Sequence, residues 1–567
     1  MAGQSFARRS AAAAVGVAAC AVLLLVVALM IGGGVSGRLL GVRIRVNDLS
    51  RPLEAAALLS AAFTVLVWRW RTARAFAVAL LAACGLLALV ALAREARITL
   101  PAGDVAVIES YVFHALDGTL LLGPYSRFQW HHPGPLYFFV LAPFYVLSGY
   151  RTSGLAAAAL AINLAALVSL AWIALRAARG SFAIVLTALS VAYVARIGVV
   201  LASQWNPHVL VLPTLAILLL LAAVAAGWTA LLPLAAALAA FAVQTHLGLA
   251  PTLAAAIGCA VALGVVGPFA PRDAGARRRL WLTVNVSLWV TLLLWFLPLA
   301  EEVSRTPGNL TKLWRFFLNS GGGVPFAAAF RAWAGALSGL IRPDFVVAWG
   351  GPLTGGGSPW IAAWAVAQVL LLAASAALEA RRLRRAPGLM QARFHVALPL
   401  LLALASLAAL WSVTRIAGEI VDHEVFWISA LGVLNTAVII DALLTALWPK
   451  VGAVPMRTSA FACGALLMAA LSLGVSQLQA VNDRSLSPGN DEVAAETLGQ
   501  EIVKYAQARP ASKLRLDIDG PAWPVAAGVI VELQKAKVPF TVREDAVWMF
   551  GEMVAPRGDE SSVIAIS

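Results

Sequence analysis

Long apolar runs alternate with short polar segments along most of this chain. They span residues 11–33, 52–68, 75–94, 133–149, 153–175, 181–200, 208–225, 229–243, 247–267, 280–299, 359–379, 393–414, 424–447 and 458–479. A helix of about 20 apolar residues crosses the hydrocarbon core of a membrane, whereas barrel strands are short and alternating. The pattern predicts an all-α polytopic membrane protein with about 13 transmembrane helices. Either the run 133–149, which is short and opens with His132-Pro133-Gly134-Pro135, or one of its neighbours is expected not to cross fully. A short or re-entrant segment at 133–149 is favoured, because Arg176 and Arg179 then lie on the cytoplasmic side.

The pattern changes after Ala480, where charged and apolar residues become mixed. Residues 514–518 alternate like a strand, 521–536 have helical periodicity, and 540–543 resemble a second strand. The chain is therefore expected to consist of a transmembrane domain, 1–480, and a small soluble α/β domain, 481–567.

Basic residues predict the orientation of the spans. They cluster at 69–74, 272–279 and 381–385 and recur at Lys450 and Arg457. Loops that carry an excess of Lys and Arg stay in the cytoplasm. The loops 95–132 and 301–358 and the C-terminal domain would then face the opposite, extracytoplasmic side. The net charge of +14 is explained by these loops, so a nucleic-acid partner is not expected.

The composition narrows the class of protein further. Hydrophobic residues make up 61% of the chain, charged residues 12%, and the mean hydropathy is +0.84, which excludes an ordinary soluble globular protein. The four cysteines fall inside apolar runs and are expected to be small buried residues. No Gly-rich phosphate-binding motif is present, so nucleotide chemistry is not expected.

Polar residues gather on the predicted outer side, where six of the seven histidines lie. The densest segment is 103–137, and its residues 104–116 have helical spacing with one apolar stripe. This predicts a helix in the membrane interface. Asp104 would begin that helix, either as an ordinary N-cap or as a functional acid. Both interpretations of Asp104 remain open at this point.

The same segment resembles a known superfamily. An acid that opens an outer amphipathic helix is followed by a Gly-rich turn and by His132-Pro133-Gly134-Pro135-Leu136-Tyr137 before the next apolar run. This order resembles the GT-C membrane glycosyltransferases, among them protein mannosyltransferases, aminoarabinose transferases and actinobacterial arabinofuranosyl- and mannosyltransferases. Two features depart from the superfamily: two extra helices precede the acid, and Val105 stands where a second acid is usual.

The resemblance implies an inverting glycosyltransferase with an extracytoplasmic active site and a polyprenyl-phosphate sugar as donor. The Ala-rich composition, with more Arg than Lys, suggests a bacterial protein. The enzyme would then lie in the inner (plasma) membrane with a periplasmic active site. The acceptor would be an extracytoplasmic glycan, lipid or protein. Asp104, or failing that Glu109, would be the general base that takes the proton of the acceptor hydroxyl. Cations would stabilise the leaving phosphate.

Candidate substrate-binding residues follow from this outer location. They are Tyr125, Arg127, His131, His132, Tyr137, Asn206, His208, Gln244, His246, Lys312, Arg415 and Glu419. Arg415 could equally pair with Glu419 one turn later, and Arg127 could stack on the aromatic rings beside it.

A metal site and a transport function are the two other possibilities for this chain. A structural or catalytic zinc is not expected because the histidines lack ligand spacing, whereas a divalent cation on Asp104 and a second acid is left open. The competing function is a secondary transporter or a lipid-linked-sugar flippase. Transporters place ionisable residues at mid-membrane and carry inverted repeats. Here Asp441 is the one acid well within a late span, and no repeat stands out.

Overall fold

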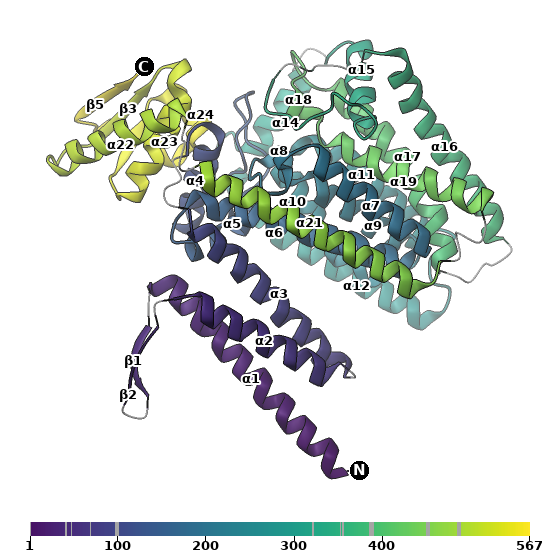
Figure 1. Cartoon of the computed structure of the whole chain (residues 1–567). Coiled ribbons are helices and arrows are strands. Elements are labelled where there is room, and N and C mark those ends of the chain that lie inside the picture. Colours follow the sequence, from purple (N-terminus) through teal and green to yellow (C-terminus); the bar gives the residue numbers. More distant parts are fainter. Residues whose placement is uncertain are drawn as a thin grey trace.

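The structure is a computed structural model that describes residues 2–33, 35–39, 42–46, 48–68, 70–96, 101–319, 323–351, 353, 357–384, 390–448, 454–484 and 489–567. Helices dominate these residues, and the strands lie in one N-terminal hairpin and in the C-terminal domain (Figure 1). These elements confirm the prediction of an all-α polytopic membrane protein with a small α/β domain, apart from the number of spans.

The N-terminal helices form a unit with its own small core. The unit consists of α1 (Ala2–Gly32), α2 (Ser50–Val67) and α3 (Arg71–Arg94), with an antiparallel hairpin of β1 (Val35–Leu39) and β2 (Val42–Val46). Val26, Phe63 and Leu80 are buried at the contacts between the three helices. In Figure 1 this unit lies below the main bundle, which it joins where α3 packs against α6.

The main bundle is built around one fully buried helix. It comprises α5 (Leu136–Leu147), α6 (Thr152–Ala177), α7 (Gly180–Arg196), α9 (Val211–Ala225), α10 (Leu232–Thr245), α11 (Ala250–Gly264), α12 (Ala274–Leu294), α16 (Pro359–Leu383), α17 (Met390–Thr414), α19 (Ile428–Leu447) and α21 (Met456–Arg484). Every residue of α9 is buried, and α9 packs against α6, α10, α11, α17 and α19. A helix that is apolar on all sides belongs in such a central position.

Shorter elements connect these helices at one end of the bundle. They are α4 (Gly103–Leu116), α8 (Asn206–Val209), α13 (Phe296–Ser304), α14 (Asn309–Asn319), α15 (Phe326–Leu337) and α18 (Asp422–Val425). Short 3₁₀ turns occur at Val199–Leu201, Thr229–Leu231, Leu247–Leu249, Gly520–Ala522, Glu544–Ala546 and Glu552–Val554. Most of the candidate site residues lie on or beside these connecting elements.

Within the described residues, ten helices are long and apolar enough to cross a membrane, or eleven if the bent pair α12 and α13 forms one span. Four shorter apolar helices, α5, α7, α10 with its preceding turn, and α15, fall below that length. The helix in the run 133–149 has only 12 residues, which agrees with the expectation that this run does not cross fully. The count of thirteen spans stays a prediction.

The C-terminal domain is a small parallel sheet with helices. It contains α22 (Asn490–Gln507), β3 (Leu514–Ile518), α23 (Trp523–Lys535), β4 (Phe540–Val542), α24 (Val547–Phe550) and β5 (Ser562–Ile566). The strands are ordered β4-β3-β5 and are parallel, with Leu514 opposite Phe540 and Ser562. The two predicted strands and the helix between them are confirmed, and α23 is the crossover that parallel strands require. The preceding helix α21 ends at Arg484, just beyond the predicted domain boundary.

The C-terminal domain covers α4. Helix α23 packs against α4, while the other side of α4 contacts α5. Gly528 permits this approach, because a β-carbon there would lie 2.4 Å from the carbonyl oxygen of Pro101. The predicted helix 104–116 is therefore present. It is enclosed between two parts of the protein, so Ile108 and Val112 on its apolar stripe are buried in protein.

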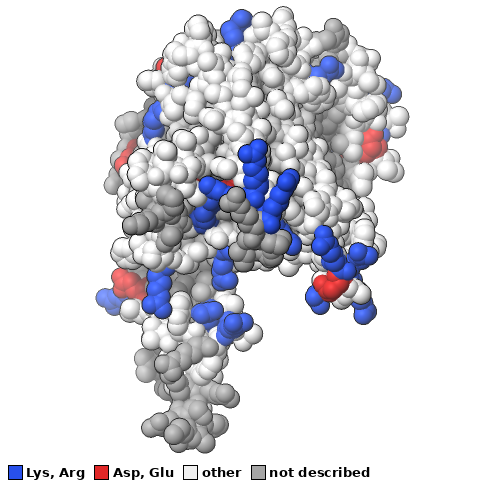
Figure 2. Space-filling model, turned by 90° about the vertical axis from the view of Figure 1, so that its right-hand side faces the viewer, with Lys and Arg blue, Asp and Glu red and all other residues white. Residues whose placement is uncertain are grey.

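Basic side chains gather at one end of the molecule. Figure 2 shows Lys and Arg clustered on the face that lies to the right in Figure 1, with few Asp and Glu among them. Helix α16 carries Arg381 and Arg382 in its last turn. The described residues thus have the charge asymmetry that is typical of multi-pass membrane proteins.

Candidate functional site

Asp104 lies in the first turn of α4, beside the C-terminal domain. The N-cap of α4 is Ala102, and no side chain caps the helix, so the N-cap interpretation of Asp104 is wrong. Gly103 before it has a φ of +55°, which favours glycine. A β-carbon on Gly103 would lie 3.6 Å from the Trp523 ring, so α23 closes the site on this side.

Two aromatic side chains hold the Asp104 carboxylate. The Tyr125 hydroxyl donates a short hydrogen bond to Oδ1 of Asp104, and the Trp205 side chain also interacts with the carboxylate. A small recess opens beside them. Its lining residues are Asp104, Val107, Ile108, Tyr111, Pro124, Tyr125, Phe138, Trp205 and Asn206. One acid thus faces a small recess whose lining is mostly apolar and aromatic.

Burial makes Asp104 a stronger base than an exposed aspartate. Removal from water raises the pKa of the Asp104 carboxyl, although Tyr125, nearby His423 and Trp205 act in the opposite direction. Burial and the Asp104 charge both raise the pKa of Tyr125, so this phenol stays a neutral donor. A carboxylate with a raised pKa takes a proton from a hydroxyl more readily.

Three predicted histidines lie at the same end of the bundle, and one of them, His208, packs against Trp205 of the recess. His132 stacks on His246 with ring centroids 5.1 Å apart, and its Nδ1 accepts a hydrogen bond of 3.0 Å from the Leu247 backbone. His208 packs edge-on against Trp205 at 4.9 Å. Burial lowers the pKa of His132 well below its usual range, so its ring is neutral in the folded protein. The structure therefore groups the predicted residues Asp104, Tyr125, Asn206, His132, His208 and His246 at this end of the bundle.

Other predicted residues secure the framework around the recess. His131 exchanges two hydrogen bonds between its backbone and the Asn309 side chain, and its Nε2 lies 2.9 Å from the Tyr111 hydroxyl. The hydroxyl of Tyr137 donates to the carbonyl of Gln204. The Gln244 side chain donates to the carbonyl of Leu294 at 2.9 Å. These contacts give His131, Tyr137 and Gln244 packing partners within the protein.

The predicted cations are engaged or exposed. Arg127 pairs with Glu424 at 3.0 Å and also donates to the backbone carbonyl of Glu419. Lys312 pairs with Glu552 of the C-terminal domain at 3.4 Å. Arg415 and Glu419 are exposed, and no ion pair between them occurs among the described contacts. The ion-pair interpretation of Arg415 thus gains no support.

Glu109, the second candidate base, is fully buried one and a half turns along α4. It accepts hydrogen bonds from Tyr145 at 2.6 Å and Thr152 at 2.5 Å. The ammonium group of Lys535, from the C-terminal domain, lies 3.0 Å from the same carboxylate. Three donors therefore enclose Glu109, which favours an anchoring role for it over the role of base.

Sequence reasoning missed several residues of this site. Trp205 and His423 come close to Asp104, and Trp548 of α24 packs edge-on against Tyr125 at 5.7 Å. Trp205 precedes the candidate residue Asn206, and His423 is one of the six outward histidines, so both had a signal. Trp548 had none, because its contact with Tyr125 joins distant parts of the chain.

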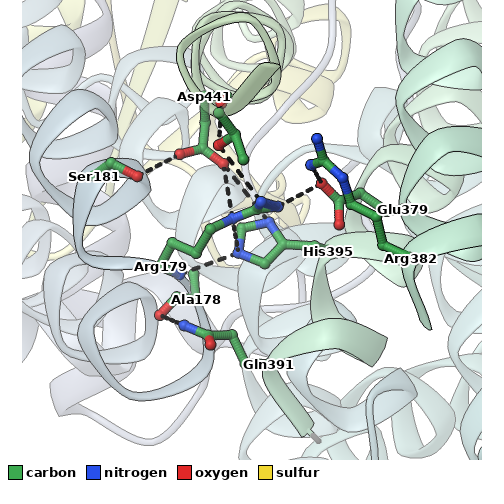
Figure 3. A network of polar contacts seen from close by, with 9 residues as sticks. Ala178, Arg179, Ser181, Glu379, Arg382, Gln391, His395 and Asp441 are labelled. Atoms are coloured by element: carbon green, nitrogen blue, oxygen red, sulfur yellow. Dashed lines mark hydrogen bonds and ion pairs between the residues drawn. The ribbon is translucent and has the colours of Figure 1, made fainter. Parts of the chain in front are cut away.

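A second polar cluster lies elsewhere in the bundle, around Arg179 (Figure 3). Arg179 precedes α7 and reaches Glu379 of α16 at 2.6 Å and Asp441 of α19 at 3.4 Å. Its backbone N–H and its Nε both donate to Nε2 of His395 on α17, at 3.0 and 3.2 Å. Arg382 pairs with Glu379 as well, at 2.8 Å. Two guanidinium groups thus balance two carboxylates, and the cluster joins four helices.

No group of three or more His, Cys, Asp or Glu side chains in the described residues is arranged to hold a metal ion. A divalent cation on Asp104 and a second acid stays a prediction. No family model, curated protein or solved structure matches the chain. The resemblance to GT-C glycosyltransferases therefore rests on the sequence motifs alone.

The contact between Lys535 and Glu109 predicts a stabilising role for this ion pair. We expect Lys535→Met to destabilise the protein by about 1–3 kcal/mol, because it leaves a buried carboxylate without its charged donor. Thermal unfolding and hydrogen exchange of residues 103–116 measure the effect. Lys504→Met, at an exposed position on α22, is the control, and equal behaviour of both variants would refute the anchoring role.

The cluster around Arg179 predicts a second, separate effect. Arg179→Met leaves Glu379 and Asp441 without the cation between them, so we expect a clearly lower midpoint of thermal unfolding. Arg176→Met, at an exposed position of the same connection, should change the midpoint little. The comparison uses detergent-solubilised full-length protein, and an unchanged Arg179→Met variant would contradict this stabilising role.

Proposed function

We propose that this protein is an inverting glycosyltransferase that uses a polyprenyl-phosphate sugar and an extracytoplasmic acceptor. The observation that carries the proposal is the placement of Asp104. One carboxylate, oriented by Tyr125 and Trp205, faces a recess lined by aromatic and apolar side chains. Aromatic faces suit the apolar side of a sugar, and the carboxylate suits its acceptor hydroxyl.

One carboxylate is sufficient for this reaction. Asp104 removes the proton of the acceptor hydroxyl while the acceptor oxygen attacks the anomeric carbon. The bond from that carbon to the phosphate oxygen breaks at the same time, and the polyprenyl phosphate leaves with the electron pair. Because the leaving phosphate is stable as an anion, a second carboxylic acid is not required. The buried position of Glu109 agrees with this use of one acid.

The charge asymmetry supports an orientation for the site. The basic face in Figure 2 would be cytoplasmic by the positive-inside rule. Arg381 and Arg382 lie in the last turn of α16, at the opposite end of this helix from its outer connection. Asp104 and the C-terminal domain would then be periplasmic, in the inner membrane of a bacterium. The donor would reach Asp104 from the membrane.

A second candidate function, a secondary transporter or a lipid-linked-sugar flippase, is favoured by one observation. The cluster of Arg179, Glu379, His395 and Asp441 is buried among bundle helices, and ionisable groups inside a membrane commonly mark transport pathways. The charges of that cluster are already balanced by Arg382, which favours a structural role for it. We therefore prefer the transferase.

The transferase proposal predicts a large effect of Asp104→Asn. The amide keeps the size of the side chain but cannot accept the proton, so we expect transfer to fall by about 10²–10⁴-fold. Purified protein is incubated with acceptor-containing membranes and with radiolabelled polyprenyl-phosphate mannose or arabinofuranose, and labelled glycoside is counted. Asp117→Asn, at the other end of α4, is the matched control.

Two outcomes would count against this proposal. Full turnover by Asp104→Asn would remove Asp104 as the base. Movement of the labelled lipid across vesicles without any glycoside product would favour the flippase instead.

The raised pKa of Asp104 predicts a pH profile. The base works only when it is deprotonated, so activity should rise with pH through a value above that of an ordinary aspartate. Tyr125→Phe removes the hydrogen bond that stabilises the carboxylate, and its activity should therefore rise at a still higher pH. The rate is measured from pH 4 to 8 for both proteins. An identical acid limb in both would contradict the proposed link between Tyr125 and Asp104.

A further inference from the structure

The cations at the outer end of the bundle are largely committed to carboxylates. Arg127 pairs with Glu424, while Arg305 and Lys312 both pair with Glu552. A leaving phosphate brings negative charge beside Asp104, and stabilising that charge is a large part of such a reaction. These three cations would have to give up a carboxylate before they could bind it. A histidine is another group that can carry a positive charge.

His423, on α18, lies on the other side of Trp205 from the recess and remains partly accessible. Its side chain is 24% exposed, whereas His132, His208 and His246 are buried. The His423 ring lies 5.0 Å from the Trp205 ring, which also contacts the Asp104 carboxylate. A charge on His423 acts on Asp104 and on each of those three histidines, so His423 is central to the group.

Asp422 and Gly350 lie against the Nδ1 edge of the His423 ring. Its Nδ1 is buried without a hydrogen-bond partner and lies 3.8 Å from Oδ1 of Asp422. Asp422 is fixed by the backbone N–H groups of Trp349 and Gly350, at 3.2 and 2.9 Å. Gly350 has a φ of +87°, and a β-carbon there would lie 3.7 Å from Nδ1 of His423. Because this side is closed, Nε2 is the nitrogen left to meet a ligand.

We propose that His423, as an imidazolium, binds the phosphate group of the polyprenyl-phosphate donor. This inference rests on the proposed function and adds a residue to it. In an inverting displacement the base and the leaving group lie on opposite sides of the anomeric carbon. Asp104 takes the acceptor proton on one side, and Nε2 of His423 donates a hydrogen bond to the departing phosphate oxygen on the other. The phosphate keeps the electron pair of the broken bond, and His423 keeps its proton.

The unpaired charged groups nearest to His423 are carboxylates. Asp422 lies behind it, Asp104 lies across Trp205, and the donor phosphate would add a further negative charge. The other titratable or charged groups around it are His132 before α5, His208 on α8, His246 after α10, and the pair of Arg127 with Glu424 on α18. Arg127 and Glu424 neutralise each other, and the three histidines are buried.

A binding experiment tests this inference without turnover. The full-length protein in detergent micelles is titrated with undecaprenyl phosphate at pH 6 and pH 8, and calorimetry in two buffers reports proton uptake. We expect about tenfold tighter binding at pH 6, with proton uptake, because a histidine must be protonated to pair with a phosphate. Farnesyl phosphate and inorganic phosphate are titrated in parallel, to separate a lipid-linked ligand from a free anion.

Two variants and one control separate charge from structure. His423→Gln should bind undecaprenyl phosphate about tenfold more weakly at pH 6 and lose the difference between the two pH values. His423→Arg should keep tight binding at both pH values, because the guanidinium is always charged. His114→Gln, at the far end of α4, should behave as the unmodified protein. Circular dichroism and gel filtration check that each variant is folded.

The outcomes are distinguishable. Unchanged affinity and pH dependence in His423→Gln would overturn the inference, as would tighter binding of inorganic phosphate than of either prenyl phosphate. If undecaprenyl phosphate binds as expected while no donor supports sugar transfer, the phosphate site stands and the proposed function fails.

Discussion

The placement of α4 between the helical bundle and the C-terminal domain is the constraint on which the rest of the site depends. Most buried residues of α4 are apolar, but Glu109 is a buried carboxylate, and a buried charged group needs partners. Glu109 finds them in Tyr145, Thr152 and Lys535. Because Lys535 belongs to the C-terminal domain, one buried carboxylate joins both parts of the protein. The same enclosure holds Asp104 at the start of the helix.

Enclosure also gives Asp104 its chemical character. Trp523 covers the turn before it, and Trp548 packs on its partner Tyr125. Both tryptophans come from the C-terminal domain, so this domain contributes directly to the apolar surroundings that raise the pKa of Asp104. A soluble module that merely carried the acceptor would not need these contacts. The domain is therefore better regarded as one wall of the site.

Local patterns in the sequence predicted much of the fold. Apolar runs predicted the long helices, and strict alternation predicted β3, whose side chains alternate between buried and partly buried positions. The strand β5 was not predicted, because it follows a charged segment and is recognisable only by its pairing with β3. The helix 104–116 was predicted in place, but its enclosure was not. Periodicity reports which face of a helix is apolar, and it does not report which distant segment will cover that face.

The same limit applies to the candidate site. Asp104, Tyr125 and Asn206 could be identified because they lie in polar segments between apolar runs, and they line one recess. The partners of Arg127, Lys312 and Glu109 could not be identified from the sequence, because each of them pairs with a residue far away in the chain. Those pairings change which residues are expected to bind a phosphate, because a paired cation must leave its carboxylate before it can bind another anion. Among the described residues, His423 lies near Asp104 and combines partial exposure with a carboxylate behind its ring. In the proposed transferase, a histidine at this position would avoid permanent burial of an unpaired cation beside a buried carboxylate.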